Sequence, residues 1–411
     1  MTIIADPRRT PHPIVYLVLY LPFGAVNGYL TVALAYSLSQ SGMSVANVGL
    51  LIALFFIPQT WKFLWAPIVD TTLSRKAWYL IGASLSAVGV LAMAEFSTHA
   101  SDVPMLSVFV VLASLAVTFL GMSVESLMAH DTPDAQKGRA AGWFQAGNLG
   151  GSGLGGGAAL WLAQRTSFPW ITGAALGACF MLCCIALWYV AEPLHEQRTQ
   201  VIGRKLIDVL HDLWRVSRSR TGYLALLVVF LPIGSGAASN LWAAVADDWR
   251  ASAHTVELVT GAMSGIAAAF GCLVGGYICD RFNRKYTYVA FGLLLALCAL
   301  GMALAARTEA TYVGFTMAYA LVNGLGYAGF SAVTLEAIGQ GAAATKYNLF
   351  ASLSNMPIAY LTALEGWAHT QWGANGFLYV DAGLGVAGIL LFIAVVNLSA
   401  PRVVPLSAEM L

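Results

Sequence analysis

The chain has 411 residues, of which 58% are hydrophobic and only 10% are charged, and its formal net charge at pH 7 is +1. A soluble domain carries about 25% charged residues, so this composition excludes a soluble globular protein and indicates an integral membrane protein. The net charge says nothing about partners. We expect the lipid bilayer as the surroundings and no nucleic-acid partner.

Apolar runs recur along the whole chain, and each is long enough to cross about 30 Å of hydrocarbon, which takes roughly 20 residues. They predict helices, because a closed barrel would show short strands of alternating polarity and these runs do not alternate. We expect twelve spans, in chain order at residues 14–40, 45–69, 77–96, 105–129, 140–163, 169–191, 221–246, 255–279, 286–306, 311–337, 347–369 and 375–398.

The segments outside these runs predict an orientation. Residues 1–13 are polar and do not form a cleaved signal peptide, because the apolar run that follows is too long for one. With an even number of spans both ends lie on one side, and that side holds seventeen of the 21 Lys and Arg residues, against three on the other, Arg165, Arg250 and Arg307. Because positive charge marks the cytoplasmic side, we predict cytoplasmic termini in a bacterial-type inner (plasma) membrane.

The two halves of the sequence repeat each other. YLPFG at residues 20–24 returns as FLPIG at residues 230–234, 210 residues later, and Glu125 matches Glu336 at an offset of 211. We therefore expect two parallel six-helix bundles, which are typical of transporters with a central site. The predicted domains are an N-terminal bundle at 1–191, a cytoplasmic linker with an amphipathic helix at 192–220, and a C-terminal bundle at 221–411.

Two motifs point to a family. GGYICDRFNRK at residues 275–285 resembles the loop between helices 8 and 9 of the major facilitator superfamily. That resemblance implies an all-α polytopic membrane protein with twelve helices in two pseudo-symmetric bundles. PQTWKFLWAPIVD at residues 58–70 resembles a branch of the superfamily that holds AmpG-type muropeptide permeases, acetyl-CoA transporters and small siderophore permeases.

The match to this branch is carried by a K-x-x-W-A-P-x-x-D pattern, present here as Lys62, Trp65, Ala66, Pro67 and Asp70. SNMPIAYLTALEG at residues 354–366 also resembles the eleventh helix of that branch. The two extra helices usual in AmpG-type permeases are not found, which favours the shorter members of the branch.

Charged residues around these motifs are candidates for a gate. Asp70 and Asp280 end helices at positions where an acid meets the positive N-terminus of a neighbouring helix. We predict that they, with the bases that follow, hold the cytoplasmic side closed in the outward-facing state: Arg75, Lys76, Arg281, Arg284 and Lys285. The alternative is that these bases only follow the positive-inside rule.

Lys62 stands eight residues before Asp70, about 12 Å along a helix, and so near the middle of the bilayer. A lysine at this depth is expected to face the cavity between the halves. It either binds an anionic group of the substrate or pairs with Glu125, so that proton binding and substrate binding compete. The remaining alternative is a side chain that extends to the cytoplasmic surface.

Glu125 and Glu336 are the predicted proton carriers, because a carboxyl group in a low-dielectric cavity can load and release protons near neutral pH. The alternative is a structural ion pair with a cytoplasmic base such as Arg139 or Lys346. Three other acids near helix ends, Asp247, Asp248 and Glu365, are interpreted as solvated side chains.

Uncharged polar and aromatic residues interrupt the helices at the depth of the expected cavity. Together with Lys62 they form the predicted substrate site: Asn27, Gln59, Trp143, Gln145, Asn148, Asn240, Trp242, Asn323, Tyr327, Asn355 and Tyr360. Amides and aromatic rings suit a polar solute such as a sugar, a peptide or an aromatic chelator. The alternative for any single residue is an interhelical hydrogen bond.

We therefore predict a monomeric secondary transporter that imports a polar or anionic organic solute of siderophore, muropeptide or acyl-CoA type together with protons, by alternating access and without a cofactor or metal. The alternatives are a proton-driven exporter of small molecules and an integral-membrane enzyme. An enzyme is disfavoured because the seven His residues lie in loops or at helix ends, and neither G-x-S-x-G nor H-E-x-x-H occurs.

Overall fold

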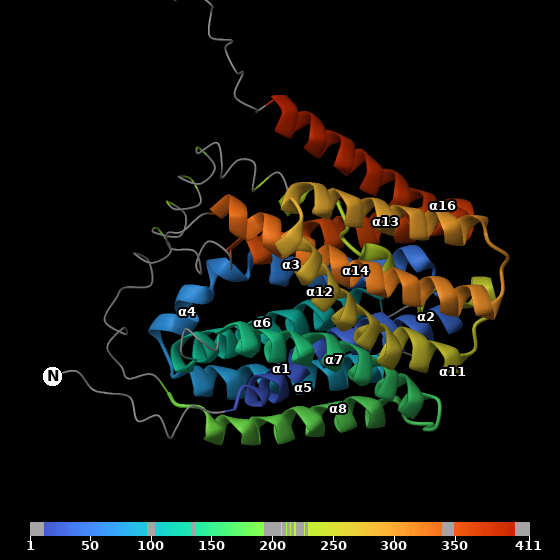
Figure 1. Cartoon of the computed structure of the whole chain (residues 1–411). Helices are drawn as coiled ribbons and strands as arrows, with labels where there is room; N and C mark the ends of the chain where they lie inside the picture. Colours follow the sequence, from blue (N-terminus) through green and yellow to red (C-terminus); the bar gives the residue numbers. More distant parts are fainter. Residues whose placement is uncertain are drawn as a thin grey trace, which may run out of the picture.

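A computed structural model describes residues 12–96, 103–132, 137–192, 229–338 and 349–398, together with Ile207, His211, Trp214, Arg218 and Leu226. The described elements are helical, and most of them lie side by side with their axes along one direction (Figure 1). We call the side near His12 and the end of the last helix the terminal side, and the other side the opposite side. The predicted linker at 192–220 lies mostly outside the described residues.

The helices follow the order of the predicted spans. In the N-terminal half they are α1 (Ile14–Gly28), η1 (Tyr29–Leu34), α2 (Ala35–Gln40), α3 (Val45–Trp61), η2 (Lys62–Leu64), α4 (Ala66–Thr71), α5 (Arg75–Glu95), α6 (Val103–Asp131), α7 (Lys137–Ala163), α8 (Pro169–Cys183) and η6 (Cys184–Tyr189). In the C-terminal half they are η8 (Ala237–Asn240), η9 (Ala246–Trp249), α11 (Ala253–Thr255), η10 (Val256–Met263), α12 (Ser264–Arg281), α13 (Arg284–Leu304), α14 (Glu309–Ile338) and α16 (Asn355–Leu398).

Local chemistry explains where several spans begin and turn. The Ser44, Ser74 and Asn283 side chains accept hydrogen bonds from the first backbone N–H groups of α3, α5 and α13, which otherwise have no partner. Gly373, with φ of 69°, breaks α16 into two antiparallel spans. Within the described residues, eight helical segments are long and apolar enough to cross a membrane, and one of them contains both spans of α16.

The seventh span departs from the expected continuous helix. Between Phe230 and Ala237 the chain is unwound, and Gly234 and Gly236 adopt φ values of 59° and 68°. Left-handed backbone of this kind is accessible to glycine without steric cost. Pro232, which precedes both glycines, has no backbone N–H group and so can donate no helical hydrogen bond. The unwound segment leaves polar side chains of this span inside the C-terminal half.

The two halves make their closest contact toward the opposite side, where α3 packs on α16 and α7 packs on η10. A Cβ atom on Gly49 would lie 2.7 Å from the backbone oxygen of Thr362, and one on Gly157 would lie 2.7 Å from that of Glu257. These distances are too short for any side chain, so the helices touch backbone to backbone. Gln40 adds a hydrogen bond of 2.6 Å to Asp247 across the same contact.

On the terminal side the contact between the halves is made by side chains. Phe63 of η2 belongs to one apolar cluster with Val229, Leu349 and Phe350 of the C-terminal half. The turn that carries Lys62 therefore lies directly at the boundary between the two halves.

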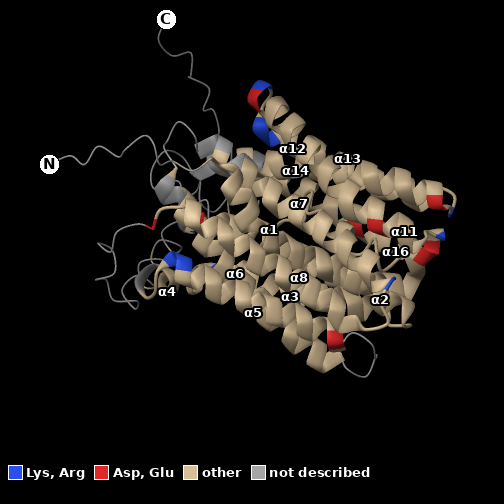
Figure 2. Ribbon diagram, turned by 90° about the horizontal axis from the view of Figure 1, so that it is seen from below, with Lys and Arg blue, Asp and Glu red and all other residues tan. Residues whose placement is uncertain are grey.

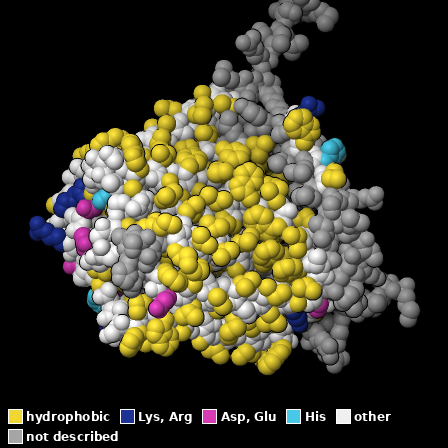
Figure 3. Space-filling model, turned by 180° about the vertical axis from the view of Figure 1, so that it is seen from behind, with side chains coloured by type: hydrophobic (Ala, Val, Ile, Leu, Met, Phe, Trp, Pro, Cys, Tyr) yellow, Lys and Arg dark blue, Asp and Glu magenta, His cyan; other side chains and the backbone are white. Residues whose placement is uncertain are grey.

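The outer surface has the composition expected for a protein in lipid. Apolar side chains cover the middle of the face shown in Figure 3, and charged side chains gather toward its two edges. In the ribbon view the described Lys and Arg residues likewise lie near the ends of the helices (Figure 2). Leu273, Phe270, Leu85 and Val88 are examples of exposed apolar residues in the middle of the helices, a pattern that water would disfavour.

Candidate functional site

Lys62 lies at a break in the second span. Helix α3 ends at Trp61, three residues of tighter helix follow, and α4 begins again at Ala66 with Pro67 in its first turn. Proline is favoured there because its missing N–H is not needed in a first turn, whereas inside a continuous helix it would remove a hydrogen bond. The W-A-P sequence thus interrupts the span and displaces Lys62 from a regular helical position.

At this break Lys62 forms an ion pair with Glu125 of α6, with 2.7 Å between Nζ and Oε1. The two side chains are only 14% and 21% exposed, so most of their hydration shell has been replaced by protein. Tyr20 of α1, itself buried, lies close enough to Glu125 to interact with it electrostatically. One of the two roles expected for Lys62 required contact with Glu125, and this contact is present.

Neighbouring hydrogen bonds fix the turn around the pair. Trp65 donates its indole N–H to Thr118 of α6 at 3.1 Å, which ties the break to the helix that carries Glu125. Close to Glu125 on α6, Ser126 accepts a hydrogen bond of 2.5 Å from Nε of Arg75. The pair therefore lies among α1, η2, α6 and the start of α5, all from the N-terminal half.

The candidate gate residues make contacts within their own halves. The Glu192 carboxylate accepts hydrogen bonds from the backbone N–H groups of Arg75 and Lys76, at 2.8 and 3.1 Å. In the C-terminal half, the Arg281 guanidinium lies 4.1 Å from the ring centre of Tyr277 on the same helix. The side chain of Asp70 lies outside the described residues.

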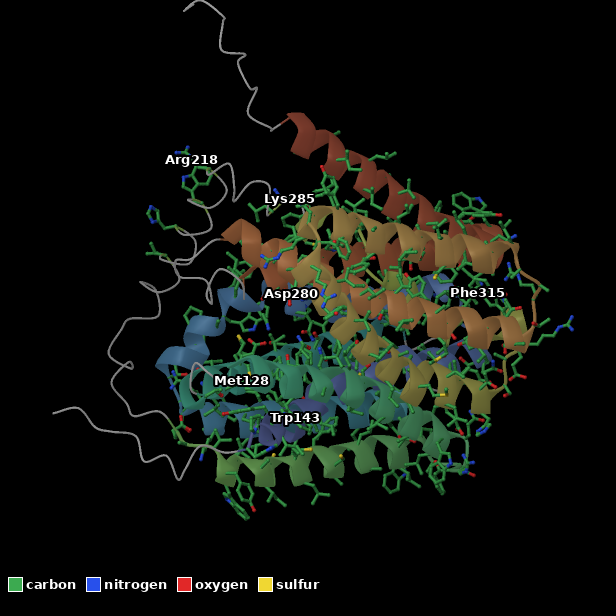
Figure 4. All side chains as sticks on the ribbon, in the orientation of Figure 1. Met128, Trp143, Arg218, Asp280, Lys285 and Phe315 are labelled. Carbon is green, nitrogen blue, oxygen red and sulfur yellow. The ribbon has the colours of Figure 1, made fainter. Side chains whose placement is uncertain are left out.

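The remaining charged candidates of the C-terminal half lie at the terminal-side end of α12 and the start of α13. Asp280 and Lys285 are exposed, Arg284 is half-buried, and Figure 4 labels the first two near the terminal-side end of the molecule. Met128 of α6, labelled in the same view, lies toward that end in the N-terminal half. The side chain of Glu336, the second predicted proton carrier, lies outside the described residues.

Several predicted substrate residues make hydrogen bonds between or within helices. Asn27 donates to Ser152 of α7 at 3.3 Å, Asn240 to Thr362 of α16 at 3.1 Å, and the Tyr360 hydroxyl to the backbone oxygen of Phe230 at 3.1 Å. Asn148 donates to Gln145 within α7, and Asn355 donates to Ala351 and Ser352 in the turn before it. These bonds satisfy one polar group on each residue.

Other predicted substrate residues keep a buried polar atom with no hydrogen-bond partner among the described residues. These atoms are Nε2 of Gln59, Oδ1 of Asn27, Oδ1 of Asn323 and Nε1 of Trp242. Buried polar atoms are rarely left unpaired, so such atoms indicate where an additional group can bind. Trp143, by contrast, is half-buried with its ring centre 6.1 Å from that of His12.

A small cleft opens in the C-terminal half where the seventh span is unwound. Ile233 and Ser235 of the unwound segment, Tyr288 of α13, Tyr327 of α14 and Ser354 contribute to its walls. Tyr327 is the predicted substrate residue that lines it, and its side chain is exposed. The unwound segment thus forms part of the wall of this cleft.

Comparison with known proteins decides the family. The family model of the Major Facilitator Superfamily matches residues 14–354. The chain belongs to the major facilitator superfamily. It is accordingly an integral membrane protein and a secondary transporter, not an enzyme, as the halves and their repeat predict.

Solved structures show that this superfamily member has the expected fold. A point mutant of the nucleoside transporter NupG aligns with a TM-score of 0.71 and 14% identity, over 93% of this chain and 98% of that one. A D-xylose–proton symporter aligns at 0.69 and 15%, over 92% and 96%. The inward-open xylose transporter XylE from E. coli aligns at 0.69 and 14%, over 93% and 96%. No curated protein sequence matches the chain.

Helix α16 of the transporter also carries two buried acids that the sequence analysis did not identify as functional. Glu365 was expected to be solvated, and Asp381 was not considered, yet both side chains are buried. The expectation for Glu365 was wrong because it placed the residue near a helix end, whereas it lies well inside the first span of α16. The available signal was an acid in each of two consecutive apolar runs.

Proposed function

We propose that this transporter carries an anionic or polar organic solute together with protons, and that Lys62 and Glu125 couple the two. The observation that carries the proposal is the ion pair itself, held at 2.7 Å near the terminal-side ends of two spans, with most of its surface removed from water. Charged residues in spans are costly and are retained where they bind a substrate or move ions. Lys62 lies at the boundary between the halves, where a solute site is expected in this architecture.

In the proposed cycle the solute and the proton replace the ion pair. An anionic group of the solute takes the place of the Glu125 carboxylate beside the Lys62 ammonium. The displaced carboxylate then binds one proton, because a negative charge without its partner is unfavourable in a low-dielectric site. The net charge of the site is the same before and after, and solute and proton move together. Release on the other side restores the ion pair.

Alternating access is supported by the two different contacts between the halves. Backbone-to-backbone contacts close the opposite side at Gly49 and Gly157, whereas Phe63 bridges the halves by its side chain on the terminal side. A rocking motion of one half against the other would separate the contacts on one side as it closes the contacts on the other side. We further propose that the terminal side is cytoplasmic and that transport is directed inward.

The class of solute is proposed from the chemistry of the site. A lysine suits a carboxylate or phosphate group, and the unpaired amide atoms of Gln59, Asn27 and Asn323 suit hydroxyl and amide groups. The resemblance of residues 58–70 to the branch described above favours a siderophore, a muropeptide or an acyl-CoA. Nucleosides and xylose, which the similar structures are named for, complete the panel to be tested.

Reconstituted vesicles test the proposal directly. Vesicles filled with a pH-sensitive dye would be offered a ferric hydroxamate siderophore, an anhydromuropeptide, acetyl-CoA, a nucleoside and xylose in turn, with and without an imposed pH gradient. We expect one solute to accumulate only with the gradient and to change the internal pH as it enters. Accumulation that is independent of pH, with no proton movement, would contradict coupling, and chemical conversion of a solute would favour an enzyme.

A further inference from the structure

A second pair of acids lies in the C-terminal half, away from Lys62. Glu365 and Asp381 are 0% and 6% exposed. Both stand eight residues from Gly373, the turn between the two spans of α16, so both lie about 12 Å from that turn along their helices. The two carboxyl groups therefore meet at one depth inside the bundle, where they interact electrostatically.

Within the described residues, Asp381 has a hydrogen-bond partner outside the pair and Glu365 does not. The Tyr319 hydroxyl of α14 contacts both oxygens of Asp381, at 3.2 and 3.1 Å. Neither oxygen of Glu365 has a hydrogen-bond partner among the described residues. Trp242 packs edge-on against Tyr319 and Phe377, with ring centres 5.3 and 5.4 Å apart, and its indole N–H is also unpaired within the described part of the chain.

The charge of the pair follows from its surroundings. The titratable groups that interact with it from the packed elements are Tyr319 of α14 and Cys298 of α13, and neither is a cation. Two carboxylates at close range in a low-dielectric interior repel each other strongly. Since the Tyr319 hydroxyl donates to Asp381, the carboxylate is assigned to Asp381 and the neutral carboxylic acid to Glu365.

Titratable side chains lie between this acid and the opposite side. His369 lies one turn after Glu365 on the same helix, and residues four apart share a helix face. Its Nε2 atom is 2.6 Å from Oδ2 of Asp248, and these side chains are 16% and 33% exposed. These groups therefore range from a buried acid, through a partly buried imidazole, to a carboxylate in contact with water.

We propose that Glu365, Asp381 and Tyr319 form a second proton-binding site, which exchanges its proton with the opposite side through His369 and Asp248. Gly366, the residue after Glu365, lies at the close contact with Gly49, so separation of the halves there would change the access of water to this site. The role of the site in coupling rests on the proposed transport function. The presence of the bound proton is independent of that function.

Infrared difference spectroscopy on the full chain in lipid nanodiscs tests for this proton without any solute. A neutral buried carboxyl group has a C=O stretching band that ionised carboxylates lack. We expect this band at neutral pH in the wild type, its loss in Glu365→Gln, its displacement in Glu365→Asp, and no change in Glu95→Gln, which alters an exposed acid. After a pH jump we expect the band to respond more slowly in His369→Ala.

Each outcome of the infrared experiment either supports or overturns the bound proton. The proposal would be overturned if the wild type lacked the band or if the band were unchanged in Glu365→Gln. It would also be overturned, in favour of a metal-cation site, if Na⁺ removed the band at constant pH. Asp381→Asn serves as a second variant if Glu365→Gln does not fold, and we expect it also to change the band. Uptake assays on the same preparations report on transport separately, so failure of transport leaves the infrared result standing.

Discussion

Each half of the molecule buries acids within its spans, but the two halves neutralise them differently. In the N-terminal half Glu125 is paired with a lysine at 2.7 Å, and both side chains keep some exposure. In the C-terminal half Glu365 and Asp381 interact with each other and with the Tyr319 hydroxyl, and they are almost completely buried. An acid with a cation beside it is a site where an anion can compete, whereas acids without a cation favour a proton.

The largest effect is expected from breaking the N-terminal pair. Lys62→Ala should reduce solute uptake about a hundredfold, because it removes the cation that binds the solute anion, a loss of roughly 3 kcal/mol for one partner of a buried charge pair. Initial uptake rates at matched amounts of protein in the membrane would measure this. Lys62→Arg keeps the charge and serves as the control. Uptake at the wild-type rate in Lys62→Ala would end the proposed role of the pair.

The second effect concerns the close contact between the halves on the opposite side. Gly157→Val should lower uptake at least about tenfold, because its Cβ atom would lie 2.7 Å from the backbone oxygen of Glu257 and keep the halves apart. Gly150→Val is the matched control on the same helix, since a Cβ atom there has no neighbour within 4 Å among the described residues. Equal loss in both variants would show an effect on α7 itself and not on the closure of the halves.

The third test compares the two kinds of acid directly. Glu125→Gln leaves Lys62 without a counter-charge and should destabilise the folded state by about 3 kcal/mol. Glu365→Gln replaces a neutral acid with a neutral amide of similar shape and should change stability by only about 0.5 kcal/mol. Thermal unfolding in nanodiscs at neutral pH would measure both. The reverse order would mean that Glu365 is the charged acid and Glu125 the neutral one.

The smallest effect extends the comparison to an acid stabilised by backbone groups alone. Glu192 accepts hydrogen bonds from the first N–H groups of α5, so Glu192→Ala should destabilise the protein by about 1 kcal/mol, as loss of a helix cap does. Uptake per folded molecule should stay close to that of the wild type. A large loss of uptake without loss of stability would instead assign Arg75 and Lys76 the gating role predicted from the sequence.

Much of the architecture could be predicted from the chain because it depends on local properties. Length and polarity predict each span, and the repeated YLPFG and FLPIG motifs predict the two halves. The family match and the structural neighbours confirm this fold. Lys62 was identifiable for the same reason, because a lysine within an apolar run is conspicuous without any knowledge of its neighbours. The unwound part of the seventh span was missed, although Gly234 and Gly236 were visible in the sequence.

By itself, then, the sequence determined which segments enter the membrane and that Lys62 and Glu125 enter with them, because the free energy of leaving water is a property of each segment. Only the tertiary structure decided that Lys62 meets Glu125 on another helix and that Glu365 meets Asp381 across the turn at Gly373. The faces that helices turn toward one another depend on how all of them pack, and burial and charge pairing follow from that packing.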